Sequence, residues 1–509
     1  MVKNQRLAGI AMSYISVGIG FVTTILYTPI MIQMVGEVEY GIYSWALGII
    51  QNLSLFQMGL YAAFTRFHAR CKAKNDVIGL ARLNALFLSL YIVIALIAFG
   101  CGMLLISACG TIIAYPAEIG NDPAQIAAAN RLMLLMVFNI CITFPTYIFE
   151  SNILVNERFI VLRAITIFRQ LFNPMICLPL LMLGWGNISL SFATMIITLV
   201  TSLVYMVYCF RVLRIRFQLY VPKWKELKEV FGFSFYILIN LVVDQVNWSL
   251  DRILLGSLVS ASAVTIYSMA DQLSRYFFNF SSMISDVYTP KIHRIVAMGS
   301  NNDELTHVFT QVARVQFMVL SLVIMGFFGV GEYFCSLYAA AASSDHEVFV
   351  VAMILFFAVL LPAIQYMAIP ILQAKNMHRY KAFINLGTVI ANGIISVPLS
   401  LMFGPVGAAI GTLIANVIGQ FILNRYFHEK VGLNMNYFWH HMVRITRGFL
   451  LPLLCVLMIH YVVRPDSLIS MVLAGALIVL VYGVSVLRYS MTAREQRVVY
   501  RFLKKVFGH

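Results

Sequence analysis

The sequence predicts an all-α polytopic membrane protein, and two observations carry this prediction. Apolar residues make up 61% of the 509 positions and charged residues only 11%, so lipid has to cover much of the apolar surface. The second observation is the placement of the 36 Lys and Arg, all but five of which lie in alternate gaps between long apolar stretches. The net charge of +15 therefore reflects membrane topology, and nucleic acid is not an expected partner.

Fourteen stretches of the sequence have the length that crosses a bilayer, about 20 apolar residues each. They cover approximately residues 7–33, 40–64, 83–109, 126–149, 163–183, 187–210, 230–257, 264–289, 310–330, 347–372, 382–402, 406–426, 444–463 and 467–487. The first is too long for a signal-peptide core, so we expect it to remain as a span. Because Lys and Arg are retained on the cytoplasmic side, the alternation of basic gaps predicts that both termini are cytoplasmic.

An internal repeat predicts two lobes of six spans each. The run GIYS at 41–44 returns as TIYS at 265–268, and Pro145 of the fourth span returns as Pro362 of the tenth. An even number of spans gives both repeats the same orientation, which predicts a pseudo-two-fold axis along the membrane normal. The expected divisions are an N-lobe at 1–218, a C-lobe at 219–430, and spans 13 and 14 with a basic cytoplasmic tail at 431–509. Two such lobes would enclose a central cleft suited to alternating access.

The sequence contains no motif for catalysis or for a cofactor. It lacks the HExxH spacing of zinc enzymes and the GxxxxGK[ST] loop that binds nucleotide phosphates, and its eight Cys include no CxxC pair. The longest predicted outer loops, 110–124 and 331–346, are too short to fold as a domain. We therefore expect a protein that is not an enzyme and that uses neither a metal nor a cofactor.

Two neighbouring predicted spans carry stripes of polar and charged residues, and each charge costs about 2.5–3.5 kcal/mol in hydrocarbon on insertion scales. The polar residues repeat along one face of each helix: Asn240, Asp244, Asn247 and Asp251 in the seventh span, and Asp271, Arg275 and Asn279 in the eighth. In an antiparallel hairpin Asp244 would lie level with Arg275, and Arg252 level with Asp271. Two interpretations stay open: the charges neutralise one another as structural pairs, or the two stripes line a water-filled cleft that handles an anion or protons.

The first half of the chain contributes two further candidates for substrate binding beside Arg252 and Arg275. Arg66 follows the second span and is either an interfacial anchor or a cleft residue. Arg169 lies one to two turns inside the fifth span, deep enough for a role in the cleft. Glu150, at the inner end of the fourth span, is expected to be solvated.

The run GEVEYGIYSWALGIIQNLSLFQMGLYAAFTRFHARCKAKND at 36–76 resembles the opening of bacterial polysaccharide flippases. These are the oligosaccharidyl-lipid exporters of the multidrug/oligosaccharidyl-lipid/polysaccharide superfamily. The resemblance rests on YGIYS, on the Met-Gly pair and on Arg66-Phe67, and it extends to residues 251–290. The chain departs from the family pattern at Gln57, where an acid is common. The resemblance implies fourteen spans, arranged as two six-span lobes plus two further spans.

The resemblance also implies a function, the movement of an undecaprenyl-pyrophosphate-linked oligosaccharide from the inner to the outer leaflet of the bacterial cytoplasmic (inner) membrane. A gradient of H+ or Na+, or the membrane potential, would supply the energy. Arginine suits such a substrate because its guanidinium binds phosphate oxygens in pairs. The alternatives are a multidrug exporter of the same superfamily, a lipid II-type flippase, and a membrane-embedded polysaccharide polymerase or ligase. Cationic drugs would need acids in the cleft, and a polymerase would need a larger outer loop.

Overall fold

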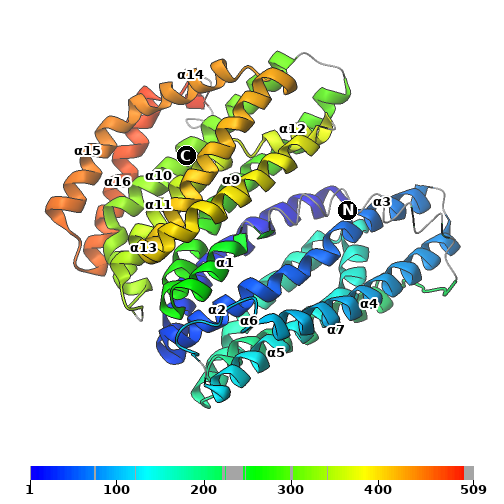
Figure 1. Ribbon diagram of the computed structural model, residues 1–509. Coiled ribbons are helices and arrows are strands. Elements are labelled where there is room, and N and C mark those ends of the chain that lie inside the picture. The colour runs from blue at the N-terminus through cyan, green and yellow to red at the C-terminus, as the bar shows by residue number, and fades with distance from the viewer. Residues whose placement is uncertain are drawn as a thin grey trace. The chain divides into compact units, whose positions relative to one another are not determined.

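The computed structural model is helical throughout the part of the chain that it describes, with no β-strand in that part. The described residues are 2–73, 76–120, 122–220, 224, 228, 245–246, 248–298, 302–340, 342–375, 377–493 and 495–497. Ten helical stretches among these residues are long and apolar enough to cross a membrane. The predicted class, an all-α polytopic membrane protein, is confirmed (Figure 1).

The chain folds as two compact units. The first contains residues 1–265 together with 341–343, and the second contains residues 266–340 and 344–509. The expected lobe divisions at 1–218, 219–430 and 431–509 stay a prediction.

The first unit is built from long helices that pack around α5. Its helices are α1 (Val2–Val35), α2 (Glu37–Ile50), α3 (Leu55–Ala73), α4 (Val77–Ala108), α5 (Pro123–Val155), α6 (Phe159–Met182) and α7 (Ile188–Arg211). Helix α5 lies against α4 and α7, while α6 lies against α1 and α7. Phe64, Phe87 and Phe144 are fully buried where α3, α4 and α5 meet. Since lipid is as apolar as these rings, close packing and not water exclusion holds such helices together.

The second predicted span, 40–64, is not one continuous helix. Helix α2 ends at Ile50, residues Gln51–Ser54 form a 3-10 turn, and α3 starts at Leu55. The side-chain amide of Asn52 donates to the carbonyl oxygen of Gly48 at 2.7 Å, and the Ser54 hydroxyl donates to that of Gln51 at 2.7 Å. Short polar side chains that bond the local backbone compete with regular α-helical hydrogen bonding, and this explains the break.

The second unit is centred on α10, which contacts α11, α14, α15 and α16. Its helices are α9 (Ala261–Ala297, which starts in the first unit), α10 (Asn302–Tyr338), α11 (Asp345–Ile364), α12 (Ala368–Ala374), α13 (His378–Tyr426), α14 (Met435–Thr446), α15 (Leu450–Met458) and α16 (Leu468–Tyr489). The fully buried amide of Gln316 in α10 donates to the Ser281 carbonyl oxygen at 2.9 Å and to Ser285 Oγ at 2.7 Å in α9. Such hydrogen bonds between helices join polar side chains inside a membrane bundle.

Helix α13 consists of two spans joined by a sharp turn. Its 49 residues would measure about 74 Å as one rod, more than twice the hydrocarbon thickness. Gly404 interrupts the helix with φ 56° and ψ −134°, and the second half folds back on the first. A Cβ on Gly407 would collide with the carbonyl oxygen of Leu399, and one on Gly411 would collide with Ser396. The two arms thus run antiparallel at close range, in agreement with the predicted spans 382–402 and 406–426.

The remaining predicted spans coincide with described helices, with one exception. Residues 230–257 fall for the most part outside the described residues, so the seventh span stays a prediction. The exact number of fourteen is consistent with the structure.

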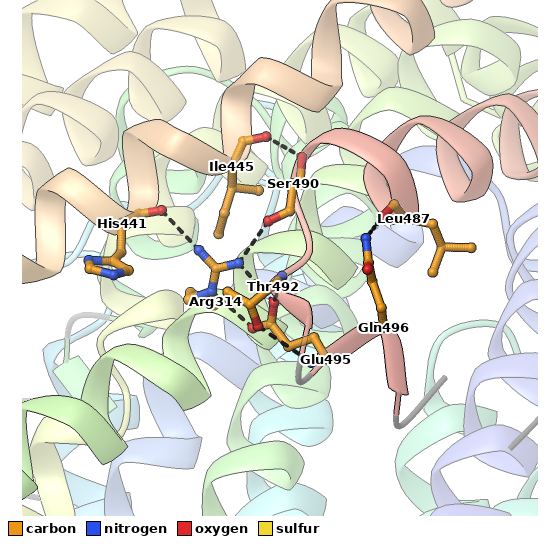
Figure 2. Close-up of polar contacts among 8 residues, drawn as sticks. All are labelled: Arg314, His441, Ile445, Leu487, Ser490, Thr492, Glu495 and Gln496. Atoms are coloured by element: carbon orange, nitrogen blue, oxygen red, sulfur yellow. Dashed lines mark hydrogen bonds and ion pairs between the residues drawn. The ribbon is translucent and has the colours of Figure 1, made fainter. Parts of the chain in front are cut away.

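Arg314 of α10 joins several chain segments by hydrogen bonds. It lies at the end of the second unit that the sequence predicts to be cytoplasmic. Figure 2 shows its guanidinium among three chain segments. It donates to both carboxylate oxygens of Glu495, to the Ser490 carbonyl oxygen at 2.8 Å and to the His441 carbonyl oxygen at 3.4 Å. Burial acts to raise the pKa of Glu495, but hydrogen bonds from Arg314 and Thr492 and the charge of Arg314 lower it below its ordinary value.

Candidate functional site

Two arginines of α6 stand inside the membrane region of the first unit. Arg163 lies one turn from the start of the helix, and Arg169 lies almost three turns in, about 15 Å along the axis. Both side chains are exposed, and neither forms an ion pair with another described residue. An exposed, unpaired arginine at this depth is costly in lipid, so it indicates a polar, accessible surface.

Helix α5, which packs against α6, contributes a carboxylate near these arginines, that of Glu150. Its side chain is half-buried, and the positive charges of Arg169 and Arg163 act on it without a direct ion pair among the described residues. Tyr61, Tyr147 and Tyr205 lie in the neighbourhood of Glu150, on α5 itself or on helices that pack against it. We call this group of side chains the Glu150 cluster; its members are Tyr61, Tyr147, Glu150, Arg163, Arg169 and Tyr205.

Four helices of the first unit supply the Glu150 cluster: α3, α5, α6 and α7. Glu150 lies one to two turns from the end of α5, or about 8 Å. Arg163 lies at a similar distance from the start of α6, which follows α5 after a short connection. The cluster is therefore at the end of the unit that the sequence predicts to be cytoplasmic.

Helix α4 places a buried tyrosine hydroxyl, that of Tyr91, beside the Glu150 cluster. Tyr91 is fully buried, and its ring centroid lies 6.1 Å from that of Tyr147. The Tyr91 and Ser151 hydroxyls lie near each other and are both fully buried. Neither completes a hydrogen bond of ordinary geometry within the described residues. Buried hydroxyls usually have partners, and these two lie close enough to serve each other.

Arg252, a predicted substrate-binding residue, is buried in the first unit. Only 8% of it is exposed, and its Nη2 donates to the Trp248 carbonyl oxygen at 3.3 Å. Its charge acts on Tyr43 of α2, and the neighbouring Asp251 is also buried. In contrast to Arg169, this arginine lies among packed helices. Its predicted pairing with Asp271 stays a prediction.

Arg275, a further predicted candidate, pairs with a residue of its own helix. Its Nε donates to Asp271 Oδ2 at 2.9 Å, one turn earlier in α9. The Arg275 side chain is 36% exposed, whereas that of Asp271 is 8% exposed. The predicted partner of Arg275, Asp244, lies outside the described residues. A half-exposed arginine held by a buried carboxylate fits either interpretation of these charges.

The structure describes the remaining candidates only in part. Arg66 is exposed on α3, and Asn279 is exposed on α9. Asn240 and Asn247 lie outside the described residues. Within the residues that are described, no three His, Cys, Asp or Glu side chains are placed to hold a metal ion together.

Sequence reasoning included Arg169 among the candidates but missed its neighbours. Glu150 was expected to be solvated because it lies near the end of a span, whereas the structure half-buries it beside three tyrosines. Arg163 was the first residue of the predicted span 163–183, whereas it lies one turn inside α6. A carboxylate within a span is a signal that could have identified the site. The closeness of Glu150 to α3 and α7 could not be predicted from the spacing of residues in the sequence.

Comparison with known proteins gives the family context of this arrangement. Residues 7–296, more than half of the chain, match the family described as polysaccharide biosynthesis protein. Two curated relatives come from Haloferax volcanii. The "Probable low-salt glycan biosynthesis flippase Agl15" is 23% identical over 217 residues, and the "Probable flippase AglR" is 29% identical over 195. The matches cover 42% and 38% of this chain, and 45% and 40% of the relatives, less than half of either.

A solved structure covers almost the whole chain. The lipid II flippase MurJ, in an inward closed conformation, is similar with a TM-score of 0.72 over 98% of this chain and 99% of that one. The sequence identity is 14%, so this likeness concerns the fold.

Proposed function

Since the chain belongs to the polysaccharide biosynthesis protein family, we propose that it is a flippase for a lipid-linked glycan. The substrate is an oligosaccharide joined through pyrophosphate to a polyprenyl lipid such as undecaprenol. The protein moves it from the inner to the outer leaflet of the cytoplasmic membrane by alternating access. Both curated relatives carry the word flippase in their names, and this supports the proposal.

The observation that carries the proposal most directly is the pair of accessible arginines on α6. Arg163 and Arg169 present two exposed guanidinium groups within one candidate span of the first unit. Guanidinium groups bind phosphate oxygens through paired hydrogen bonds, and tyrosine hydroxyls nearby can donate to phosphate or sugar oxygens. A cationic drug would be repelled by this pair, so the site favours an anionic substrate over a multidrug role.

The energy source and the orientation of the chain complete the proposal. The sequence has no nucleotide-binding motif, so a gradient of H+ or Na+ or the membrane potential drives transport. Both termini lie in the cytoplasm, as the distribution of Lys and Arg predicts. The protein acts as a transporter without chemical conversion of its substrate.

Deletion of the gene tests this function. We expect a lipid-linked glycan to accumulate on the cytoplasmic leaflet, where mass spectrometry of extracted lipids identifies it. Expression of the wild-type chain should remove the accumulated glycan, and the Arg169→Ala variant should not. Arg131→Ala is the matched control, because Arg131 is exposed on α5 close to its predicted outer end and lies outside the Glu150 cluster.

The outcome separates the proposal from its rival. A deletion strain that accumulates no lipid-linked glycan but loses resistance to cationic drugs would contradict the flippase function. It would support a multidrug exporter instead.

A further inference from the structure

We infer that the second unit binds an anionic phospholipid of the cytoplasmic leaflet through Arg444, Arg447 and Arg488. Arg444 belongs to the last turn of α14, Arg447 begins the short 3-10 turn that follows it, and Arg488 belongs to the last turn of α16. The ligand is a lipid of the surrounding bilayer and not the transported glycan. The inference therefore goes beyond the proposed function and does not rest on it.

The ends of α14 and α16 are joined by two hydrogen bonds. The Ser490 hydroxyl donates to the Ile445 carbonyl oxygen at 2.6 Å, a contact that Figure 2 shows. The Ser485 hydroxyl donates to the Gly448 carbonyl oxygen at 2.8 Å. A Cβ on Gly448 would collide with Ser490 Oγ, so the turn after α14 lies directly against the end of α16.

The three arginines lie beside these contacts. Arg444 and Arg447 are three residues apart, which places them on the same side of one helical turn. Arg488 comes between the two serines that bond the turn. All three arginines are exposed, whereas both serines are buried. Three accessible guanidinium groups therefore project from backbones that are held together.

These arginines lack the carboxylate partner that other arginines of the second unit have. Arg314 and Arg425 each pair with a glutamate, at 2.9 and 2.8 Å. None of the three forms an ion pair with another residue that the structure describes. From residue 430 to 509 the sequence has only two acids, and Glu495 pairs with Arg314, while Asp466 precedes α16 at its opposite end. The surface thus carries positive charge that an anion can neutralise.

The position of the three arginines favours a lipid over a soluble anion. Helix α16 has 22 residues and a length of about 33 Å, close to the thickness of the hydrocarbon, so Arg488 at its end lies near the membrane–water boundary. Val484, one turn before Arg488, is 65% exposed, and Leu450, one turn after Arg447, is 68% exposed. A phosphate can bind the arginines while its acyl chains cover these apolar side chains. A soluble acidic peptide would leave the apolar side chains uncovered.

The retention of basic residues in the cytoplasm explains why arginines occur at this end of the unit. It does not explain why arginines of two helices converge where the helices are bonded to each other. A guanidinium binds phosphate oxygens in pairs, and basic sites between the cytoplasmic ends of membrane helices bind anionic headgroups. The convergence is therefore typical of a specific lipid site.

Native mass spectrometry of the full-length protein in detergent tests the inference, with dioleoyl phosphatidylglycerol as the titrated probe. We expect the wild type to bind it more tightly than dioleoyl phosphatidylcholine, which has the same acyl chains and no net charge. Each arginine near a membrane surface strengthens the binding of anionic lipid by about fivefold. The triple variant Arg444→Gln/Arg447→Gln/Arg488→Gln should therefore bind phosphatidylglycerol about a hundredfold more weakly.

The first unit supplies a control with the same change of charge, Arg211→Gln/Arg214→Gln/Arg216→Gln. These arginines are also exposed at an end that the sequence predicts to be cytoplasmic, but they follow one another in and directly after the last turn of α7. This variant should bind phosphatidylglycerol as the wild type does. If the triple variant of the site fails to fold, its three single variants decide, because each should weaken binding about fivefold.

A second measurement is the unfolding temperature. A lipid that binds the folded state stabilises it, so phosphatidylglycerol should raise the unfolding temperature of the wild type more than that of the triple variant of the site. Equal shifts in the two proteins would contradict the site.

Three results of the mass spectrometry would overturn the inference. Equal losses of binding in the two triple variants would assign it to general positive charge. Equal affinity of the wild type for the two phospholipids would show that the headgroup charge is not recognised. Displacement of phosphatidylglycerol by an equal concentration of farnesyl pyrophosphate would assign the surface to polyprenyl pyrophosphates instead. The proposed function is judged separately, by glycan accumulation in the deletion strain.

Discussion

Arg314 and Glu495 hold each other through two parallel hydrogen bonds, Nε to Oε1 and Nη2 to Oε2, each 2.9 Å long. The two side chains are only 4% and 14% exposed. The same guanidinium reaches the Ser490 and His441 carbonyl oxygens, so one side chain of α10 fixes both α14 and the segment after α16 (Figure 2). Paired geometry of this kind is what offsets the cost of burying two charges.

Arg314→Ala should strongly destabilise the second unit. The substitution leaves Glu495 buried without its counter-ion, a change that costs about 3–5 kcal/mol. Unfolding of the protein in nanodiscs, followed by circular dichroism, measures the loss. The exposed pair Arg425–Glu429 gives the control: Arg425→Ala should change stability by less than about 1 kcal/mol. Equal losses of stability in the two variants would show that the buried pair stabilises the protein no more than the exposed one.

Acid should weaken the same contact. The pKa of Glu495 is lowered in the folded protein from an ordinary value of 4.5. A lowered pKa contributes stability that is fully present above the ordinary value and is lost as the pH falls through the folded one. We therefore expect the unfolding temperature to fall below about pH 4.5, and less steeply in Glu495→Gln. Parallel pH profiles of the wild type and the variant would contradict this assignment.

Gly407→Ala should disturb the turn-back of α13. Its new methyl group would meet the carbonyl oxygen of Leu399, a backbone atom that cannot move aside cheaply. We expect a loss of about 1–3 kcal/mol in the free energy of unfolding, as for other overpacked sites. Gly387→Ala on the same helix has open space around it, so it should be neutral or slightly stabilising. Equal unfolding of the two variants would contradict a close approach of the two arms at Gly407.

Asp271→Ala should impair glycan export more than the double variant Asp271→Ala/Arg275→Ala. The single substitution leaves the positive charge of Arg275 in α9 without the carboxylate that holds it at 2.9 Å. The same order is expected for Asp244→Ala and its double variant with Arg275→Ala. Export by each strain is measured as lipid-linked glycan on the outer leaflet, with Asp466→Ala in an exposed segment as the control. A double variant clearly worse than both single ones would rule out a structural pairing.

The sequence predicted the helical class and most of the spans because lipid imposes a length and a composition on any segment that crosses it. It did not predict the break at residues 51–54, where side chains of Asn52 and Ser54 bond the local backbone. A hydropathy profile does not detect such a break, because the residues on both sides remain apolar.

The candidate site was predicted in part. Arg169 stood out since an arginine inside a span always requires an explanation. The partners of Arg275 and Arg169 were harder to predict. Depth matching predicts Asp244 as a partner of Arg275, and this pairing stays a prediction because Asp244 lies outside the described residues. Within those residues Arg275 pairs with Asp271, a neighbour one turn away on the same helix. For Arg169, no rule of spacing pointed to Glu150 on α5 or Tyr205 on α7.

By itself, the sequence determined that the chain crosses the membrane many times and which loops carry the positive charge. Both properties depend only on the order of residues and on the cost of placing each in lipid or water. The tertiary structure alone decided that Glu150, Arg163 and Arg169 come into one neighbourhood with tyrosines of three helices. Their proximity arises from the packing of α3, α5, α6 and α7, and packing depends on shapes that no single stretch of sequence contains.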